Sequence, residues 1–506
     1  MVNEATAKNA TLGFEAELWK AAEKMWGHIP AAEYRQILIG LIFLRYVSAT
    51  FKSLYDELAA EGWQEERDAY KAKNVFFVPE SARWDKIAAA THTPEIGVVL
   101  DQAMEAIEKE NPTLKNILPK IYASPDIDKK VLGEVVDLFS NRVDMADIAA
   151  DKDILGRTYE YCVREFAAYE GKKGGEFYTP ASIVRTLVNV IKPEPGKRIY
   201  DPCCGSGGMF VQSIEFIKAH QSQRGANNFA VYGQEANPDT WRMAKMNLAI
   251  RGITCDLGPS ADDTFRNDIF ANKKFDYILA NPPFNLKEWG QSELQDDIRW
   301  QYGIPPAGNA NFAWIQHMIH HLAPNGRIGL VLANGAVSST TSGEGEIRKA
   351  LVEADLVEGI VAMPTQLFYS VTIPVTLWFF NKAKSRPGET LFIDARNLGF
   401  MEDKTHRDFK PEDIAKIAGA FEAFRDGTFE NETGFAAAVT TDEIVKKDCN
   451  LVPGRYVGIV EDEGDGEPFA EKMSRLTNEL TAQMAESNAL DAKIVEVLKA
   501  VMGGDK

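Results

Sequence analysis

The residues with the clearest chemical potential form the tetrapeptide Asn281-Pro282-Pro283-Phe284, which directly follows the apolar run 275–280. Two successive prolines fix the backbone and prevent it from continuing as a central strand. The rigid turn would present the side-chain oxygen of Asn281 and the carbonyl of Pro282 as paired acceptors for one planar NH2 group, while the ring of Phe284 stacks on the flat ring that bears it. The pattern predicts a site that orients an exocyclic amine for in-line attack on an electrophile, and it requires no Asp or Glu base at this turn.

A second chemical feature is the turn Asp201-Pro202-Cys203-Cys204-Gly205-Ser206-Gly207-Gly208, which follows a short apolar run and opens a helical segment. Glycines allow a backbone to approach a ligand closely. A loop that binds phosphate would avoid the carboxylate of Asp201, because its amide groups must face an anion. The acid instead suits a ligand that carries an ammonium group.

Acidic residues also follow the next two segments of the chain. Glu235 comes directly after the predicted strand 229–233, where a carboxylate can accept hydrogen bonds from both hydroxyl groups of a ribose. Asn267 and Asp268 come after the following segment and offer an amide and a carboxylate to the edge of an adenine. An adenosine pocket with an acid for an ammonium group fits S-adenosylmethionine, which would then face the Asn281 turn.

The elements that must position these residues alternate between strand and helix from residue 197 to about 395. Short apolar runs predict strands at 198–200, 229–233, 277–280, 328–333, 357–363, 372–380 and 391–394. Helical spacing occurs at 182–191, 209–220, 239–251, 312–322 and 346–353. The alternation predicts an α/β, Rossmann-like fold with a mostly parallel sheet and helices on both faces. Ligands of such sheets bind beyond the carboxyl ends of the strands, where Asp201, Glu235 and Asn281 fall.

The composition limits the classes of protein to consider. The chain has 506 residues, of which 45% are hydrophobic and 26% charged; this is ordinary globular usage and enough for about three domains. Its 5 cysteines are too few and scattered for a disulfide framework and suggest a reducing compartment. No signal peptide is visible, and the most apolar run, 37–47, is shorter than the roughly 20 residues of a membrane span. We expect this run to be a buried helix, the protein to be cytoplasmic, and no membrane to be a partner.

The charge balance argues against a free-standing DNA-binding protein. Lys and Arg number 56 against 74 Asp and Glu, so the formal net charge is −18. DNA-binding proteins usually carry a basic surplus, because contacts with phosphates supply much of their affinity. Either nucleic acid is not the substrate, or a partner supplies much of the affinity for it.

Three regions are predicted along the chain. Residues 1–165 carry apolar side chains at helical spacing and predict an N-terminal helical domain. Residues 166–455 contain the predicted sheet and the chemical motifs. Residues 456–506 comprise an acidic linker at 461–467 and an amphipathic helix, for which docking to a partner and folding back onto its own domain are equally open.

The order of the motifs resembles that of a known family. Gly-Glu-Phe-Tyr-Thr-Pro at 175–180, the Asp201 turn and Asn-Pro-Pro-Phe at 281–284 resemble S-adenosylmethionine-dependent DNA methyltransferases that modify N6 of adenine, in the gamma order of motifs. More narrowly, Leu-Gly-Arg-Thr-Tyr-Glu-Tyr at 155–161, the helical N-terminal domain and the C-terminal helix resemble the modification subunit of type I restriction-modification systems. The resemblance covers nearly the whole chain and is weakest after residue 400.

The resemblance implies a role for each matched residue. One group would bind S-adenosylmethionine: Glu176, Phe177, Tyr178 and Thr179 along its methionine end, Asp201 at its ammonium group, Gly205, Ser206 and Gly207 in close backbone approach, Glu235 at its ribose and Asp268 at its adenine. A second group would hold the target adenine, which must leave the duplex because its N6 is committed to pairing there: Asn281, Pro282, Pro283 and Phe284. No metal site is expected; His317, His320 and His321 are interpreted as helix-packing and surface residues.

The resemblance also implies partners that would account for the acidic charge. In this family a separate specificity subunit reads double-stranded DNA and is bound by two copies of the modification subunit, and a restriction motor subunit is a further candidate partner. The chain alone is then expected to bind DNA weakly. The polar segment 285–310 is expected to be either a mobile loop that closes over the target base or a disordered surface insertion, the two being equally open.

Three alternatives remain open. A protein glutamine N5-methyltransferase also acts on a planar NH2 group and resembles this chain at the Asn-Pro-Pro turn, usually with Tyr in place of Phe284, but it fits the helical domain and C-terminal helix poorly. N4 of cytosine in DNA is a second acceptor to consider. The third alternative is a methyltransferase that has lost its activity and serves as a scaffold, against which the intact Asp201, Glu235 and Asn281 argue.

Overall fold

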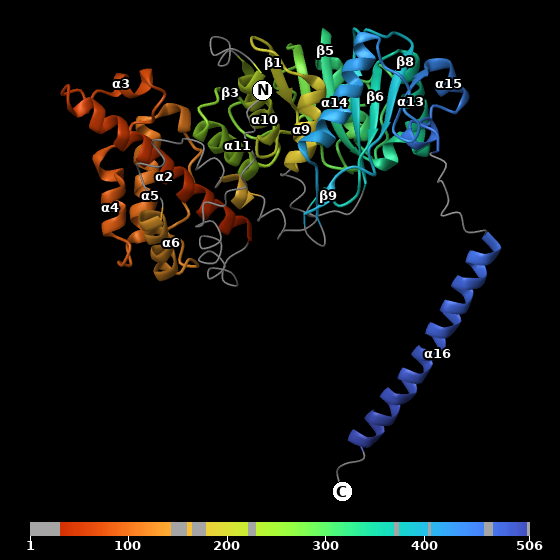
Figure 1. Cartoon of the computed structure of the whole chain (residues 1–506). Helices are drawn as coiled ribbons and strands as arrows, with labels where there is room; N and C mark the ends of the chain where they lie inside the picture. The colour runs from red at the N-terminus through yellow and green to blue at the C-terminus, as the bar shows by residue number, and fades with distance from the viewer. Residues whose placement is uncertain are drawn as a thin grey trace, which may run out of the picture. The chain divides into compact units, whose positions relative to one another are not determined.

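The computed structural model describes residues 31–142, 159–163, 179–220, 229–368, 374–402, 406–459 and 469–502 (Figure 1). The chain forms two compact units, residues 1–458 and residues 459–506. The predicted N-terminal helices and the predicted sheet therefore belong to one unit. The boundary expected between residues 165 and 166 lies outside the described residues, and the division into 1–165 and 166–455 stays a prediction.

The described N-terminal part of the first unit is helical. Its elements are α2 (Ala31–Ala59), α3 (Arg67–Ala72), η1 (Glu80–Ala82), α4 (Trp84–Ala89), α5 (Ile96–Glu110), η2 (Pro112–Leu114) and α6 (Lys129–Arg142). Residues 37–47 of α2 are buried throughout, which confirms the expected core helix. By length and composition α2 could cross a membrane, but 83% of its apolar window is buried inside the protein. The guanidinium of Arg45 lies 4.7 Å from the ring of Trp84, and this cation–π contact offsets part of the cost of its burial.

A sheet of nine described strands forms the centre of the first unit. The strands are β1 (Arg198–Asp201), β2 (Ala230–Gly233), β3 (Cys255–Asp256), β4 (Phe275–Ala280), β5 (Leu322–Ala333), β6 (Val357–Ala362), β7 (Val375–Asn381), β8 (Glu389–Asp394) and β11 (Ala436–Thr440), in the spatial order β11-β8-β6-β7-β5-β4-β1-β2-β3. Seven run in one direction, and β7 and β11 run antiparallel to their neighbours. The mostly parallel α/β fold is thus confirmed. The parallel neighbours β1, β2 and β4 bring their carboxyl ends to one edge.

Helices cover both faces of the sheet, because successive side chains of each strand enter two different cores. Ile199, Tyr277 and Leu279 pack in one core with α9 (Ala181–Ile191), α10 (Gly208–His220), α11 (Pro238–Ile250) and α14 (Pro411–Asp426). Tyr200 and Ile278 pack in the other with α12 (Asn311–His321), α13 (Glu344–Glu353) and α15 (Thr441–Lys446). The remaining elements are η4 (Gln291–Glu293), η5 (Asn334–Val337), η6 (Thr341–Gly343), η7 (Pro453–Arg455) and a small sheet of β9 (Phe400–Met401) and β10 (Arg407–Asp408).

The second unit contains one long described helix, α16 (Phe469–Met502). Its exposed large apolar side chains are Phe469, Met473, Leu476, Leu480, Met484, Leu490, Ile494 and Val495. They recur mainly every three or four residues, so they share one stripe of the helix. The amphipathic C-terminal helix expected from the sequence is confirmed.

A buried ion pair fixes α14 to the sheet. The carboxylate of Glu358 in β6 accepts hydrogen bonds from Nη2 of Arg425 at 2.6 Å and from Nδ2 of Asn381 at 2.8 Å. The Arg425 guanidinium also donates to the carbonyl of Val190 in α9 at 2.6 Å. Burial would raise the pKa of Glu358, but the charge and hydrogen bonds of Arg425 and the amide of Asn381 hold it below its usual value. The pair therefore joins the sheet to two helices.

Replacing Arg425 with Ala should lower the free energy of unfolding by about 3–5 kcal/mol, because the Glu358 carboxylate would remain buried without its partner. Urea denaturation followed by circular dichroism measures the change. The control Lys349→Ala breaks an exposed pair, with 3.9 Å between Lys349 Nζ and Glu353 Oε1, and should cost less than about 1 kcal/mol. Similar costs for the two variants would contradict a structural role of the buried pair.

Candidate active site

The carboxyl edge of the sheet opens into two neighbouring clefts that share Cys203. The first, which we name the Asp201 cleft, lies over β1 and reaches the end of β4; among its lining residues are Tyr159, Glu160, Thr179, Asp201, Cys204, Gly205, Ser206, Asn247 and Asn281. The second, which we name the Glu235 pocket, lies over β2 and is lined among others by Arg35, Glu235, Asp263, Thr264, Phe265, Pro283 and Trp314. The motifs at the ends of β1, β2 and β4 thus meet at one edge.

Asp201 ends β1 with only 2% of its surface exposed. Its Oδ1 accepts a hydrogen bond from the backbone N–H of Cys203 at 3.0 Å. Burial raises the pKa of Asp201 to about 7, and the charge of Glu235 acts in the same direction, against the lowering effect of the Cys203 hydrogen bond. A carboxylate that is costly to ionise is stabilised by a nearby cation. This environment suits an ammonium group of a ligand.

The glycine turn after β1 carries two left-handed residues, Gly205 at φ +53° and Gly207 at φ +81°, a conformation that favours glycine. The N–H of Gly205 donates to Oε2 of Glu235 at 3.0 Å, and the carbonyl of Ser206 accepts from Nδ2 of Asn247 at 2.7 Å. Gly205 and Ser206 line the Asp201 cleft. Gly207 instead faces Leu248. A Cβ added to Gly207 would lie 3.5 Å from the Leu248 side chain, which is an ordinary contact, so glycine is favoured at this position by the positive φ of the turn and not by lack of space.

Glu235 links the two clefts. Besides accepting from Gly205, its carboxylate accepts from the backbone N–H of Asn237 at 2.9 Å, which fixes its orientation at the tip of β2. The carbonyl of Glu235 accepts from the N–H of Asp262 at 2.9 Å and so holds the loop after β3 beside it. This contact brings Asp263 and Thr264 into the wall of the Glu235 pocket.

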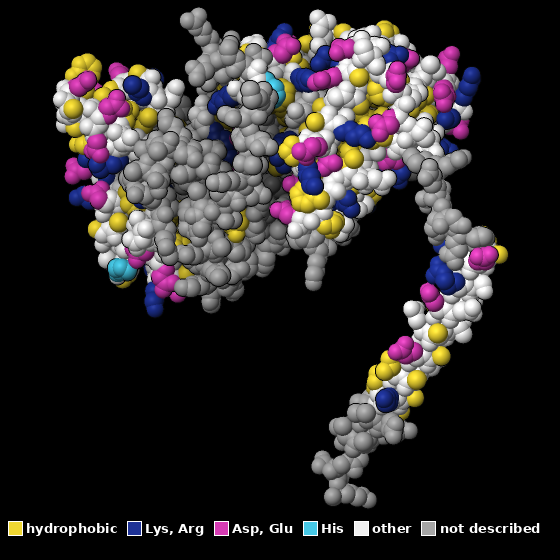
Figure 2. Space-filling view, in the orientation of Figure 1, with side chains coloured by type: hydrophobic (Ala, Val, Ile, Leu, Met, Phe, Trp, Pro, Cys, Tyr) yellow, Lys and Arg dark blue, Asp and Glu magenta, His cyan; other side chains and the backbone are white. Residues whose placement is uncertain are grey.

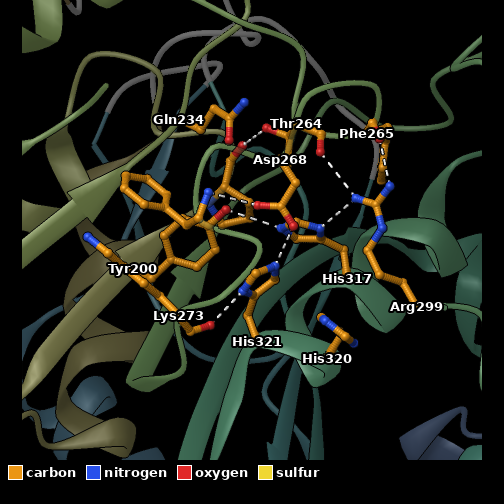
Figure 3. Close-up of polar contacts among 12 residues, drawn as sticks. Tyr200, Gln234, Thr264, Phe265, Asp268, Lys273, Arg299, His317, His320 and His321 are labelled. Atoms are coloured by element: carbon orange, nitrogen blue, oxygen red, sulfur yellow. Dashed lines mark hydrogen bonds and ion pairs between the residues drawn. The ribbon is translucent and has the colours of Figure 1, made fainter. Parts of the chain in front are cut away.

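The structure places Asp268 away from both clefts. Its Oδ2 lies 2.7 Å from Nε2 of the buried His321, and its Oδ1 accepts from the N–H of Phe270 at 3.0 Å (Figure 3). It is not among the described residues that line either cleft, whereas Asp263 is. The two-residue strand β3 was not expected from the sequence, so the acid Asp263, which follows it in the chain, was not considered.

The amide of Asn281 is held in one orientation. Its Nδ2 donates to the hydroxyl oxygen of Thr179 at 3.0 Å. Its Oδ1 is buried and, among the described residues, has no hydrogen-bond partner. A buried acceptor without a donor costs about 1–3 kcal/mol, which a ligand N–H placed there would recover. Of the two prolines that follow, Pro282 is buried and Pro283 lines the Glu235 pocket.

The structure describes two of the remaining expected site residues, Phe284 and Thr179. Phe284 is half-buried, and its ring packs edge-on against that of Phe368 with 5.8 Å between centroids. Thr179 lines the Asp201 cleft, where its contact is with Asn281. Glu176, Phe177 and Tyr178 lie outside the described residues.

Several lining residues were not predicted. Tyr159 and Glu160 belong to the motif at 155–161 that carried the family resemblance, but no site role was assigned to them. Arg35 comes from α2, more than 160 residues before Asp201, and only the packing of α2 against α11 brings it to the Glu235 pocket. Periodicity places Arg35 on a helix and gives no indication of this tertiary contact.

Three histidines lie on α12, and two of them form a cluster with Asp268. The ligand atoms of Asp268, His317 and His321 lie within 4.8 Å of one another, so an acid does accompany the histidines. However, both nitrogens of His317 contact Tyr200 and Arg299, and both nitrogens of His321 contact Asp268 and the carbonyl of Lys273 (Figure 3). Packing and hydrogen bonding therefore account for the orientation of both rings, and the cluster needs no metal ion to explain it.

The segment 285–310 is packed against the second core, which contradicts the expectation of a disordered insertion. Trp289 is 2% exposed and Trp300 is 8% exposed. The indole N–H of Trp289 donates to the carbonyl of Pro306 at 3.0 Å, and the N–H of Ala310 donates to the carbonyl of Leu286 at 3.0 Å. The segment therefore folds back on itself directly after the Asn281 turn.

The sheet order, the acidic strand tips and the proline turn define the class of Rossmann-like S-adenosylmethionine-dependent methyltransferases. Residues 150–465 match the family described as N-6 DNA Methylase, and residues 14–139 match the HsdM N-terminal domain. Because the first match covers more than half of the chain, the protein belongs to the N-6 DNA methylase family.

Individual relatives narrow this class. The chain is 47% identical over 441 residues to the type I restriction enzyme HindI methylase subunit of Haemophilus influenzae, which covers 82% of this chain and 98% of that protein. It is 40% identical over 517 residues to the MjaIX methylase subunit of Methanocaldococcus jannaschii, covering 96% and 91%. A type I restriction-modification methyltransferase subunit from Streptococcus thermophilus shares the fold, with a TM-score of 0.75, 24% identity and coverage of 88% and 99%. The expected resemblance to type I modification subunits is confirmed.

The environment of Asp201 predicts a pH dependence of cofactor binding. S-adenosylhomocysteine, the demethylated form of the cofactor, carries the same ammonium group, which prefers the ionised carboxylate. Its affinity should therefore rise as the pH increases from 5.5 to the pKa of about 7, by up to tenfold per pH unit, and level off above it. Isothermal titration calorimetry across this range measures the effect.

The control is Asp201→Asn, whose affinity should be low and nearly independent of pH over this range. Binding of 5′-methylthioadenosine, which lacks the ammonium group, should also show no such rise in the wild-type chain. A flat profile for S-adenosylhomocysteine in the wild type would refute the contact between Asp201 and the ammonium group.

Proposed function

We propose that this chain transfers a methyl group from S-adenosylmethionine to N6 of an adenine in DNA, as the methylase subunit of a type I restriction-modification complex in the cytoplasm. Family membership supports the reaction class. The observation that carries the proposal is the buried, partnerless Oδ1 of Asn281, directed by Thr179 at the sheet edge that holds Asp201 and Glu235.

The residues present fit the cofactor. Asp201 would bind its ammonium group, Gly205 and Ser206 would approach it through their backbone, and Glu235 would accept from the ribose hydroxyls. Asp263 replaces Asp268 as the acid proposed for the adenine edge. Bound S-adenosylmethionine would supply an electrophilic methyl group. Glu176, Phe177 and Tyr178 keep their proposed place along the methionine end, beside Thr179.

The proline turn would hold the target base. Oδ1 of Asn281 and the carbonyl of Pro282 would accept the two N–H groups of the adenine amine, which directs the nitrogen lone pair toward the methyl group. Pro283 keeps the turn rigid, and Phe284 offers its ring to the flipped base. The amine loses its proton during or after the transfer, so the chain needs no carboxylate base at this position.

The alternatives receive less support. The matched family description names N-6 DNA methylation, which favours adenine N6 over cytosine N4 and over the glutamine side chain of a protein. The match of residues 14–139 to the HsdM N-terminal domain assigns the helical part to the same family. The orphaned acceptor of Asn281 also argues against a scaffold that has lost its activity, because such a group is costly to keep buried without a function.

The charge and the second unit support partners for this chain. Acidic and basic side chains are interspersed over the described surface in view in Figure 2, and the net charge is −18. A separate specificity subunit would supply the contacts that read double-stranded DNA. The exposed stripe of α16 would dock on helices of that subunit, and a second copy of this chain would bind equivalently. A restriction motor subunit would join the same complex, and no membrane partner is proposed.

Replacing Asn281 with Ala should lower the rate of methyl transfer by about 100-fold or more, because it removes an acceptor that acts on the amine in the transition state. The affinity for S-adenosylhomocysteine should change by less than about threefold. Transfer of a labelled methyl group to plasmid DNA by the assembled complex, followed by digestion and identification of the base, measures both the rate and the product.

Thr179 offers a matched pair of variants for the same site. Thr179→Val removes the hydroxyl that orients the Asn281 amide and should reduce the rate by about tenfold, whereas Thr179→Ser retains it and should stay within about threefold of the wild type. An active Asn281→Ala enzyme, or N4-methylcytosine as the product, would overturn the proposed chemistry.

The stripe of α16 predicts where the complex assembles. The double variant Met473→Glu with Leu480→Glu should abolish co-purification with the specificity subunit, because it places two charges on the apolar stripe. The control Asn478→Glu with Ala482→Glu adds the same charge to the opposite side of the helix and should leave assembly intact. Cofactor binding should be unchanged in both, and normal assembly of the first variant would exclude α16 as the docking helix.

A further inference from the structure

Arg299 is a buried cation in the segment that follows the Asn281 turn, with 5% of its surface exposed. Its five N–H groups are all engaged. Two of them pair with the carboxylate of Asp297 at 2.8 and 2.7 Å, and the other three donate to the carbonyl of Thr264 at 3.1 Å, the carbonyl of Phe265 at 2.6 Å and Nδ1 of His317 at 3.0 Å. Figure 3 shows the guanidinium directed between Phe265 and His317. Because every N–H group of this planar guanidinium has an acceptor, we interpret its burial as a specific structural contact.

The two carbonyl acceptors belong to the wall of the Glu235 pocket. Thr264 and Phe265 line this pocket together with Glu235 and Pro283. They lie in a turn outside any strand or helix, so their carbonyls depend on donors from elsewhere in the fold. The hydroxyl of Thr264 also donates to the carbonyl of Pro202 at 2.5 Å, one residue after Asp201. The position of Thr264 therefore affects both the wall of the Glu235 pocket and the backbone next to Asp201.

His317 completes the arrangement as a neutral ring. Burial lowers its pKa well below the usual value, and the neighbouring His321 and Arg299 act in the same direction. Its Nδ1 accepts from Arg299, so the proton must reside on Nε2, which lies 3.1 Å from the hydroxyl of Tyr200 in β1. A second positive charge beside the buried guanidinium is thereby avoided. The result is a continuous hydrogen-bonded path from the segment after the target-base turn, through α12, to β1.

From this geometry we infer that Arg299 is a positioning residue that sets the affinity for the adenosine part of the cofactor, by holding the backbone of Thr264 and Phe265 in the wall of the Glu235 pocket. The inference rests on the proposed function, since it assigns this pocket to the cofactor. Arg299 is not among the described residues that line either cleft, so it would act through Thr264 and Phe265. It joins the segment that follows the Asn281 turn to the pocket proposed for adenosine, so this segment and the pocket wall support each other.

The test uses the conservative variant Arg299→Lys in the full chain. Lysine keeps the charge but offers three donors from a single atom, which cannot reach four separate acceptor groups. The dissociation constant for S-adenosylhomocysteine, measured by isothermal titration calorimetry, should rise by about tenfold. The control Arg266→Lys alters an exposed arginine that directly follows Phe265 and whose Nε lies 3.3 Å from Oε2 of Glu293. It should change the dissociation constant by less than about twofold.

A second readout separates positioning from a general loss of structure. In the assembled enzyme, saturating S-adenosylmethionine should restore the methylation rate of Arg299→Lys to within about twofold of the wild type, so that KM rises and kcat does not fall. Asp297→Asn keeps the guanidinium while weakening its anchor, and should raise the dissociation constant in the same direction but by less. It serves as the second variant in case Arg299→Lys does not fold.

The outcomes are distinguishable. Normal binding by the wild type with affinity unchanged in Arg299→Lys, or a lower kcat with unchanged KM, would overturn the inference and leave the proposed function intact. If Arg299→Lys does not fold and Asp297→Asn binds as tightly as the wild type, the inference fails too. Absence of S-adenosylhomocysteine binding by the wild-type chain would overturn the cofactor assignment and this inference with it.

Discussion

Nδ2 of Asn281 donates to the hydroxyl oxygen of Thr179, and this hydrogen bond decides which atom of the amide remains for a ligand. With the nitrogen engaged, the oxygen is the atom left buried without a partner among the described residues. The turn after Asn281 cannot relax toward a donor elsewhere, because two prolines restrict the backbone. The site therefore holds an acceptor at a fixed point and makes a ligand N–H group its best partner. The proposed recognition of an amine rests on the geometry of this one amide.

The second constraint is electrostatic. The sheet buries Asp201 at the end of β1, so that the ionised carboxylate is unfavourable until a cation neutralises it. Glu235 lies close enough to add to this cost and is held there by the N–H groups of Gly205 and Asn237. Two acids at neighbouring strand tips thus favour a ligand that carries a positive charge and ribose hydroxyl groups. The amine acceptor at β4 and the acids at β1 and β2 share an edge because these strands are parallel neighbours.

The sequence predicted those features that depend on local patterns. Apolar runs located β1, β2, β4, β5, β6, β7 and β8, and motifs at their ends located Asp201, Glu235 and Asn281, because a residue that follows a parallel strand must lie at the carboxyl edge. The antiparallel direction of β7 could not be predicted, since the sequence of a fully buried strand is apolar whether the strand runs parallel or antiparallel to its neighbours. The strand β11 was not predicted, because its small residues, Ala436–Thr440, form a weak apolar pattern.

Features that depend on tertiary contacts were not predictable from spacing. Asp268 was predicted at the adenine edge and Asp263 was not considered, because β3 has only two residues and left no recognisable strand before the acid. Arg299 lies in a polar segment whose composition suggested a surface loop, and only its five hydrogen bonds to partners up to 35 residues away reveal its role. Arg35 reaches the Glu235 pocket from a different region of the chain. In each case the position of the side chain is set by packing between segments that lie far apart in the sequence, which periodicity does not encode.

The central claim is that Oδ1 of Asn281 accepts a hydrogen bond from the amine of the target adenine. A structure of the assembled enzyme with double-stranded DNA and S-adenosylhomocysteine tests it most directly. The account predicts an adenine outside the duplex, with its N6 at about 2.7–3.2 Å from Oδ1 of Asn281. An N6 atom beyond hydrogen-bond reach of Asn281, or an amide whose oxygen has turned to face Thr179, would contradict it.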